Sequence, residues 1–263
     1  MRGIKVWGRA AAWGMALLLM ATTTGARGGE GAVSPLRVAA SSDLQPVFST
    51  LAKQFAAQGG GEVVGIFDSS RSLGRQIAMG AAYALFLSSD EEAAREAATE
   101  APALLPPQRV ARGALVLWSA KPWVLSQWRT LLLSPEVRQV AMVNPQKDPH
   151  GQSALELLRA SGLEGAVQPK RMLGETLAQV ADMVEGGAAE LGFVDKARLL
   201  ALPEEKRGQW FELPPDLAPP IPVTAVLLPS PVGGRTEEAL AFYQFLASPA
   251  ARPLWRTAGY QAP

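Results

Sequence analysis

The chain has 263 residues, 48% hydrophobic and 19% charged, a composition typical of a folded globular protein and not of a disordered one. Its 25 Lys and Arg residues nearly balance 24 Asp and Glu residues and form no basic block, so the composition does not support nucleic-acid binding. The sequence contains no cysteine, which excludes disulfides, thiolate metal sites, cysteine nucleophiles and a lipid anchor attached through cysteine.

Residues 1–32 have the order of a secretory signal peptide. Basic residues come first, an apolar stretch covers residues 10–20, and small and polar residues follow. The apolar stretch is too short to span a membrane comfortably. We therefore predict export to the periplasm, cleavage after Ala26 or Ala32, and a soluble mature protein that is not lipid-anchored.

Two serine-bearing turns follow, each between an expected strand and an expected helix. The first is Ser41-Ser42-Asp43, after a strand at 36–40 and before apolar residues at helical spacing over 44–55. The second is Ser69-Ser70-Arg71-Ser72, after a strand at 63–67. Such junctions bring hydroxyls and free backbone N–H groups to one point, which can hold an anion. Helix N-capping is the simpler interpretation of each serine.

Strand-like and helix-like segments then alternate through the chain. Further strands are expected at 84–87, 114–118, 139–143, 191–194 and 223–228, and helices from about 90 and at 126–132, 150–160, 175–185, 236–246 and 249–257. This alternation predicts an α/β protein with largely parallel sheets. The proline-bearing stretches 102–110 and 213–222 are interpreted as two crossovers between lobes, with a ligand cleft between the lobes. Lobe 1 is assigned to 36–113 plus 224–263, and lobe 2 to 114–223.

Six short stretches, in order, match a known family. They are 38–44, 69–77, 85–90, Asn144-Pro145 with Pro149-His150-Gly151, 191–194 and 258–260. Through them the chain resembles the periplasmic molybdate-binding proteins of ATP-driven oxyanion importers. The resemblance implies the two-lobed periplasmic binding protein fold, with a cleft between lobes that a two-strand hinge joins.

The resemblance also implies a set of ligand-binding residues. Ser42 and Ser70 would give hydroxyls and backbone N–H groups, with Ser69 alongside, and His150 and Leu177 would each give a backbone N–H. The oxyanion of molybdenum or tungsten would be held by these neutral donors, without direct metal ligands and without a cofactor. Dry, preorganised donors of this kind can replace the hydration shell of a dianion.

Four positions depart from the family pattern. Asp195 stands where many members have a tyrosine that closes over the ligand, Asp68 and Arg71 replace small residues, and Ala84 replaces an acidic one. Carboxylates beside the site should weaken binding of a fully ionised oxyanion, and Arg71 could offset one of them.

Asp195 itself is open to two interpretations. It could cap the helix that begins near Lys196, or pair with Lys196 or Arg71. Alternatively it could accept a proton from a ligand such as hydrogen phosphate or a phosphonate. The second hypothesis would fail if the wild type bound molybdate as tightly as Asp195→Tyr, or more tightly.

Enzymatic activity is not expected. Ser70, His150 and Asp195 are the residue types of a hydrolytic triad, but no Gly-x-Ser-x-Gly motif surrounds Ser70. His150 is the only histidine, so a multi-histidine metal site is impossible.

The sequence therefore predicts a monomeric solute-binding protein that captures molybdate or tungstate for an inner-membrane permease of an ABC importer and binds no nucleic acid. The alternatives are a binding protein retuned to a protonated or organic anion, and a module that senses its ligand rather than delivering it.

Overall fold

The computed structural model describes residues 34–229 and 235–263, and Pro35–Pro263 forms one compact unit. The predicted signal peptide lies outside the described residues. The fold is built on two five-stranded sheets, with strand orders β2-β1-β3-β10-β4 and β7-β6-β8-β5-β9. None of the helices that the structure describes is both long and apolar enough to cross a bilayer.

The strands of both sheets are short. The first sheet contains β1 (Leu36–Ser41), β2 (Val63–Asp68), β3 (Leu85–Ser88), β4 (Gln108–Gly113) and β10 (Ile221–Leu227). The second contains β5 (Leu115–Ser119), β6 (Val140–Val143), β7 (Arg171–Gly174), β8 (Leu191–Asp195) and β9 (Gln209–Glu212). The prediction of largely parallel sheets needs correction. Both sheets are mixed, because β10 runs antiparallel to β3 and β4, and β5 runs antiparallel to β8 and β9.

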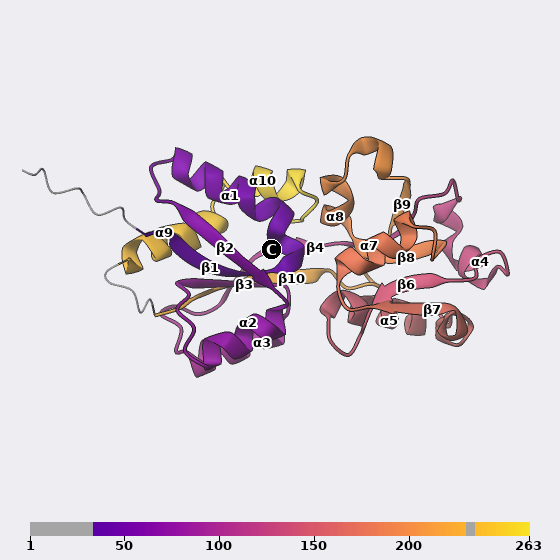
Figure 1. Cartoon of the computed structure of the whole chain (residues 1–263), viewed down its shortest axis with the longest axis horizontal. Coiled ribbons are helices and arrows are strands. Elements are labelled where there is room, and N and C mark those ends of the chain that lie inside the picture. The colour runs from indigo at the N-terminus through magenta and orange to yellow at the C-terminus, as the bar shows by residue number, and fades with distance from the viewer. Residues whose placement is uncertain (1–33, 230–234) are drawn as a thin grey trace, which may run out of the picture. The chain divides into compact units, whose positions relative to one another are not determined.

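Helices cover both faces of the first sheet (Figure 1). One face packs against α1 (Gln45–Ala57), α9 (Thr236–Leu246) and α10 (Arg252–Thr257), and the other against α2 (Ser70–Ala78) and α3 (Glu91–Glu100). Side chains along β1 alternate between the two faces of the sheet. Val38 and Ala40 pack in the core beneath α1, α9 and α10, whereas Ala39 packs in the core beneath α2 and α3.

The second sheet is layered in the same way. Its helices are α4 (Trp128–Leu133), α5 (Pro149–Ala160) and α6 (Glu164–Val167) on one face, and α7 (Leu177–Glu185) and α8 (Lys196–Ala201) on the other. Short 3-10 turns complete the chain: η1 (Ser42–Leu44), η2 (Leu125–Gln127), η3 (Gln168–Lys170) and η4 (Glu204–Lys206). Along β5, Leu115 and Leu117 enter one core while Val116 and Trp118 enter the other.

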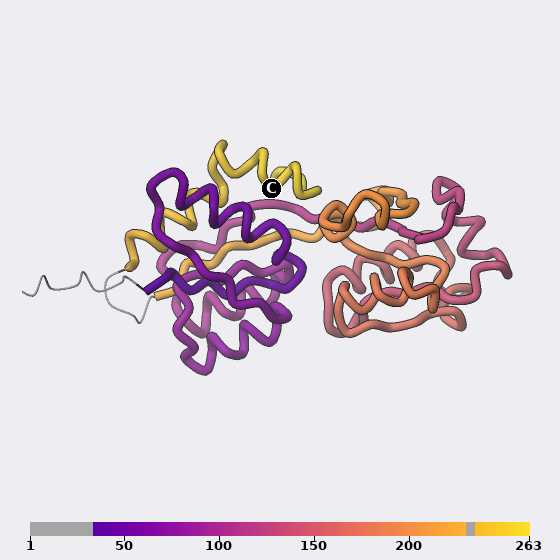
Figure 2. The backbone as a smooth tube through the Cα atoms, turned by 45° about the horizontal axis from the view of Figure 1, so that its top comes forward, coloured from indigo at the N-terminus to yellow at the C-terminus, as the bar shows by residue number. Residues whose placement is uncertain are grey.

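Two segments connect the sheets and run side by side (Figure 2). The first leads from β4 to β5 through Ala114, and the second returns into β10, where Ile221 pairs with Gly113. The predicted crossover at 102–110 is therefore wrong, since that stretch runs into β4 of the first sheet. Strand β10 begins at Ile221 rather than 223. It tolerates Pro222 because the β3 pairing starts only at Thr224, so Pro222 has β4 as its one strand neighbour.

Candidate functional site

A cavity of about 150 Å³ lies where the two serine turns meet the starts of helices from the second sheet. Its lining residues are Ser41, Ser42, Asp43, Gln45, Ser69, Asp148, Glu175, Thr176, Leu177, Ala178 and Arg198. A water molecule occupies about 30 Å³, so the cavity has roughly the room of five waters. That volume suits a small anion with four oxygens.

In the first serine turn, the carboxylate of Asp43 accepts hydrogen bonds from one hydroxyl of the turn and from one hydroxyl outside it. Ser41 Oγ donates a hydrogen bond to Asp43 Oδ1, and Ser89 Oγ donates to the same oxygen at 3.0 Å. The Ser41 and Ser89 hydroxyls are 2.8 Å apart. Ser42, one of the predicted ligand residues, is exposed and lines the cavity. The turn thus presents a carboxylate and a serine hydroxyl together.

In the second serine turn, the two predicted serines differ. Ser69 is the N-cap of α2, because its hydroxyl accepts from the Ser72 backbone N–H at 3.2 Å. Asp68 strengthens this cap by accepting from the backbone N–H of Ser69 at 2.7 Å and from Ser72 Oγ at 2.6 Å. Ser70 is more than nine-tenths buried, yet its Oγ has no partner among the described residues. Capping therefore explains Ser69 but leaves the Ser70 hydroxyl unused.

The two backbone N–H donors expected from the second lobe, those of His150 and Leu177, differ in whether they already have an acceptor. Asp148 caps α5, and its Oδ1 accepts from the His150 backbone N–H at 2.8 Å, so that predicted donor is engaged. Leu177 is the first residue of α7, after its N-cap Thr176, and lines the cavity. The amino end of this helix offers free N–H groups there.

His150 carries a positive charge at neutral pH. Burial lowers its pKa, but the attraction and hydrogen bond of Asp148, 2.9 Å from Nδ1, together with the attraction of Asp43 and Asp195, outweigh burial and raise the pKa to about 9. The same imidazolium lowers the pKa of Asp148 in spite of burial. Burial raises the pKa of Asp195 to about 6, although His150 opposes the change.

Asp43, His150 and Asp195 also form the one cluster in the described part of the chain with the donor set of a metal site. Each offers a ligand atom, and these atoms lie within 4.8 Å of one another. The raised pKa of His150 keeps the imidazole protonated at neutral pH in the absence of a metal, and a metal would have to displace that proton. The imidazolium therefore offsets part of the negative charge of the two carboxylates.

Asp195 adopts the simpler of its two predicted roles. It is the N-cap of α8, and its Oδ1 accepts from the Ala197 backbone N–H at 2.7 Å. Its Oδ2 lies 3.4 Å from the hydroxyl of Tyr260. The predicted pairing with Lys196 is wrong, since Lys196 Nζ binds Glu212 at 2.6 Å.

Arg71 does not offset a carboxylate of the site, contrary to the prediction. Its Nε donates to Asp90 Oδ2 at 3.0 Å, which raises the pKa of the guanidinium. Its Nη1 donates to the Gln146 carbonyl at 3.3 Å. Arg71 therefore ties the start of α2 to α3 and to the loop after β6.

The residue types of a hydrolytic triad do not assemble into one. The Ser70 hydroxyl makes no hydrogen bond to His150 within the described ranges, and His150 Nδ1 faces Asp148 rather than Asp195. A serine nucleophile needs a base in hydrogen-bond contact.

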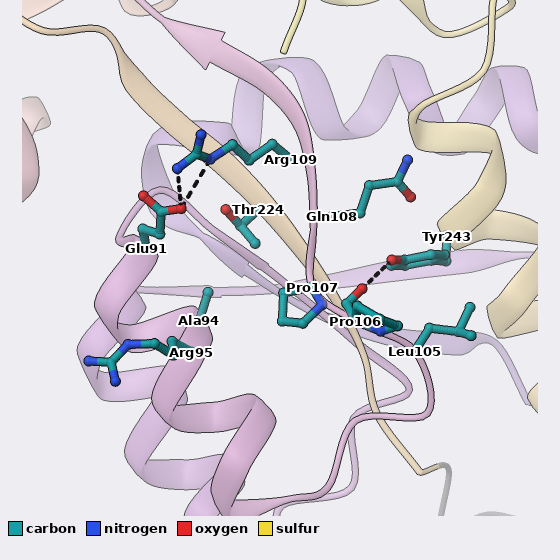
Figure 3. Close-up of a pocket in the computed structure, with 10 residues that line it drawn as sticks. All are labelled: Glu91, Ala94, Arg95, Leu105, Pro106, Pro107, Gln108, Arg109, Thr224 and Tyr243. Atoms are coloured by element: carbon teal, nitrogen blue, oxygen red, sulfur yellow. Dashed lines mark hydrogen bonds and ion pairs between the residues drawn. The ribbon is translucent and has the colours of Figure 1, made fainter.

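A larger cavity, about 750 Å³, lies elsewhere, beside α3, β4 and α9 (Figure 3). Glu91 and Arg109 pair across its rim at 2.5 Å, and the Tyr243 hydroxyl donates to the Pro106 carbonyl at 2.7 Å. It contains none of the residues predicted to bind ligand.

Eight of the residues that line the cavity were not predicted from the sequence, among them Asp43, Asp148 and Arg198. Asp43 belongs to the first serine motif, where its carboxylate beside two hydroxyls was a usable signal. Asp148 precedes Pro149, and an Asp before a proline is a signal for a helix start. Arg198 lines the cavity from α8, and nothing in its local sequence indicates this.

Comparison with known proteins agrees with this architecture. Residues 36–261 match the family model of bacterial extracellular solute-binding proteins. The chain belongs to this family. It is therefore a binding protein rather than an enzyme, as the sequence predicted.

Individual relatives of this solute-binding protein cover most of its length. It is 30% identical to the molybdate-binding protein ModA of Azotobacter vinelandii over 86% of this chain and 89% of the relative, and 31% identical to ModA of Rhodobacter capsulatus over 78% and 80%. A solved structure of the Azotobacter vinelandii periplasmic molybdate-binding protein superposes with a TM-score of 0.76 at 30% identity, covering 87% of this chain and 99% of that one. The sulfate-binding protein SubI of Mycobacterium tuberculosis, at 16% identity and a TM-score of 0.68 over 88% and 87%, shares the fold.

Proposed function

We propose that this protein binds molybdate or tungstate outside the cytoplasm and delivers it to the membrane permease of an ABC importer. The observation that carries the proposal is the cavity between the serine turns and the start of α7, in a chain related to molybdate-binding proteins over most of its length. In this proposal the oxyanion is cargo, and no cofactor takes part.

The donors around the cavity support an oxyanion. Ser42 and Ser69 line it from one side, and the amino end of α7, at Thr176 and Leu177, lines it from the other. The Ser70 hydroxyl, one residue beyond Ser69, is buried and does not line the cavity in this structure, but it has no partner among the described residues and is free to donate. An anion that accepts hydrogen bonds from both lobes would hold them closed.

The cellular context is proposed with the function. The mature protein would be a periplasmic monomer, released after signal-peptide cleavage and not lipid-anchored. The permease would recognise the closed, ligand-bound form. Size-exclusion chromatography with light scattering, and mass spectrometry of the exported protein, would test the monomer and the cleavage site.

A thermal-shift panel tests the ligand. Molybdate, tungstate, sulfate, phosphate and a phosphonate are each added to the mature protein, and calorimetric titration measures the affinity of any that shift the melting temperature. A ligand at about 100 times its Kd adds about 2.7 kcal/mol, which corresponds to about 5–10 °C for a protein of this size. We expect this shift with molybdate and tungstate.

Matched serine variants show where the ligand binds. Ser42→Ala removes a hydroxyl from the cavity lining and should weaken molybdate binding about tenfold, the value of one hydrogen bond to a charged group. Ser49→Ala, an exposed position on α1, should leave the affinity unchanged. A shift with phosphate or the phosphonate alone would instead favour a protonated ligand. No shift with any oxyanion would contradict the proposed function.

A further inference from the structure

Arg198 borders the cavity with a guanidinium that has no partner in the described part of the chain. It lies on α8 and lines the cavity, and its Nε is buried without a hydrogen bond. No ion pair with a described carboxylate involves it either. A buried N–H of a charged group that lacks an acceptor is costly, so an acceptor from outside the chain is expected there.

The carboxylates around the cavity are already engaged by other groups. Glu175 binds Lys147 Nζ at 2.7 Å, and Asp148 binds His150 Nδ1 at 2.9 Å. Asp43 accepts hydrogen bonds from two serine hydroxyls. Asp195, three residues before Arg198, caps its own helix. Arg198 is therefore close to several acids without being paired to any.

The other positively charged side chains near the cavity already have acidic partners. Arg71 is bound to Asp90, and Lys196 is bound to Glu212. His150 is held between its neighbouring carboxylates. Of these groups, Arg198 is the one whose charge remains available for a ligand.

We propose that Arg198 contacts the bound oxyanion directly and supplies the positive charge that lets a fully ionised tetrahedral anion enter a cavity lined by carboxylates. This inference rests on the proposed function and adds a specificity-determining residue to it. A guanidinium presents its N–H groups as a planar fork that matches two oxygens of such an anion. It also offsets the repulsion from the carboxylates that line the cavity, Asp43 among them, which a site of neutral donors alone could not do.

The test compares Arg198→Met and Arg198→Lys with the wild type in calorimetric titrations with molybdate at low and high ionic strength. Arg198→Met keeps the apolar stem and should weaken binding about 10- to 100-fold, the range for losing charge-assisted hydrogen bonds. It should also flatten the decline of affinity with salt. Arg198→Lys should keep the salt dependence and lose part of the affinity, because an ammonium cannot bind two oxygens as a fork.

Arg95→Met is the matched control, since Arg95 lies at the other, larger cavity (Figure 3). The carboxylate of Glu92 lies 3.7 Å from its guanidinium. This variant should bind molybdate like the wild type. Urea denaturation without ligand separates a binding role from a structural one. Arg198→Met should be as stable as the wild type, or more stable, because it removes a buried N–H without an acceptor.

Two results would overturn the inference. If the wild type binds molybdate and Arg198→Met binds it with the same affinity, Arg198 is not a ligand residue and the proposed function stands. Arg198 has a structural role if Arg198→Met lowers both the stability and the molybdate affinity, while Arg198→Lys keeps both at the wild-type level and its affinity does not depend on salt. Failure of the wild type to bind any oxyanion would instead overturn the proposed function, and this inference with it.

Discussion

The protonation state of His150 can be measured directly because the chain contains one histidine. Its pKa rises from the ordinary value of 6.5 to about 9, since the attraction and hydrogen bond of Asp148, with the attraction of Asp43 and Asp195, outweigh burial. Folding therefore favours the protonated form. The resulting stabilisation is complete below pH 6.5 and is lost as the pH rises through 9. At 1.36 kcal/mol per pKa unit, this amounts to about 3 kcal/mol.

Two assays check this. In proton NMR, the ring resonance of His150 should titrate with a midpoint near 9, and in Asp148→Asn the midpoint should fall because the main attraction is gone. In urea denaturation, the free energy of unfolding should decline by about 3 kcal/mol between pH 6.5 and 9.5 for the wild type. His150→Gln should remove that decline while leaving other titrating groups in place. A midpoint between 6 and 7 in the folded wild type would refute the reasoning.

Three further predictions concern the junctions that shape the site. Ser70→Ala should leave the free energy of unfolding unchanged, because Oγ has no partner among the described residues, and should weaken oxyanion binding in calorimetry. Ser69→Ala should lower stability by about 1 kcal/mol in urea denaturation, because it removes a helix cap; no loss would contradict the cap. Gly151→Ala should lose about 1–3 kcal/mol in the same assay, since a Cβ there would lie 2.3 Å from the Val143 carbonyl oxygen. Gly165→Ala, whose Cβ meets no atom within 4 Å, is its control, and equal stability of the two variants would refute the clash.

The strands that the sequence failed to predict share a place in the fold. β4, β7 and β9 are all edge strands of their sheets. Edge strands have one neighbour and one exposed side, so they need not show the apolar run that marks a buried strand. β4 and β9 each begin with glutamine, and β7 begins with arginine. Their pairing partners define them as strands more than their own residues do.

The structure places the predicted ligand residues in two kinds of position. Ser42, Ser69 and Leu177 line the cavity. Ser70, His150 and Asp195 are buried instead and do not line it. The ion-pair partner of Arg71 could not be predicted from the sequence either. Asp68 is nearer in sequence than Asp90, but the packing of α2 against α3 places Asp90 beside the guanidinium.

The sequence by itself determined the positions of the strand-to-helix junctions. Strand periodicity, serine and aspartate caps and the helical spacing of apolar residues act over a few residues, so they predict where strands end and helices begin. Only the tertiary structure decided which charged side chains of the site lie close enough to interact. Asp43, His150 and Asp195 come from three distant segments, and their ligand atoms lie within 4.8 Å only because the sheets position those segments together. Electrostatic interactions depend on such distances and on burial, and neither is a local property of the chain.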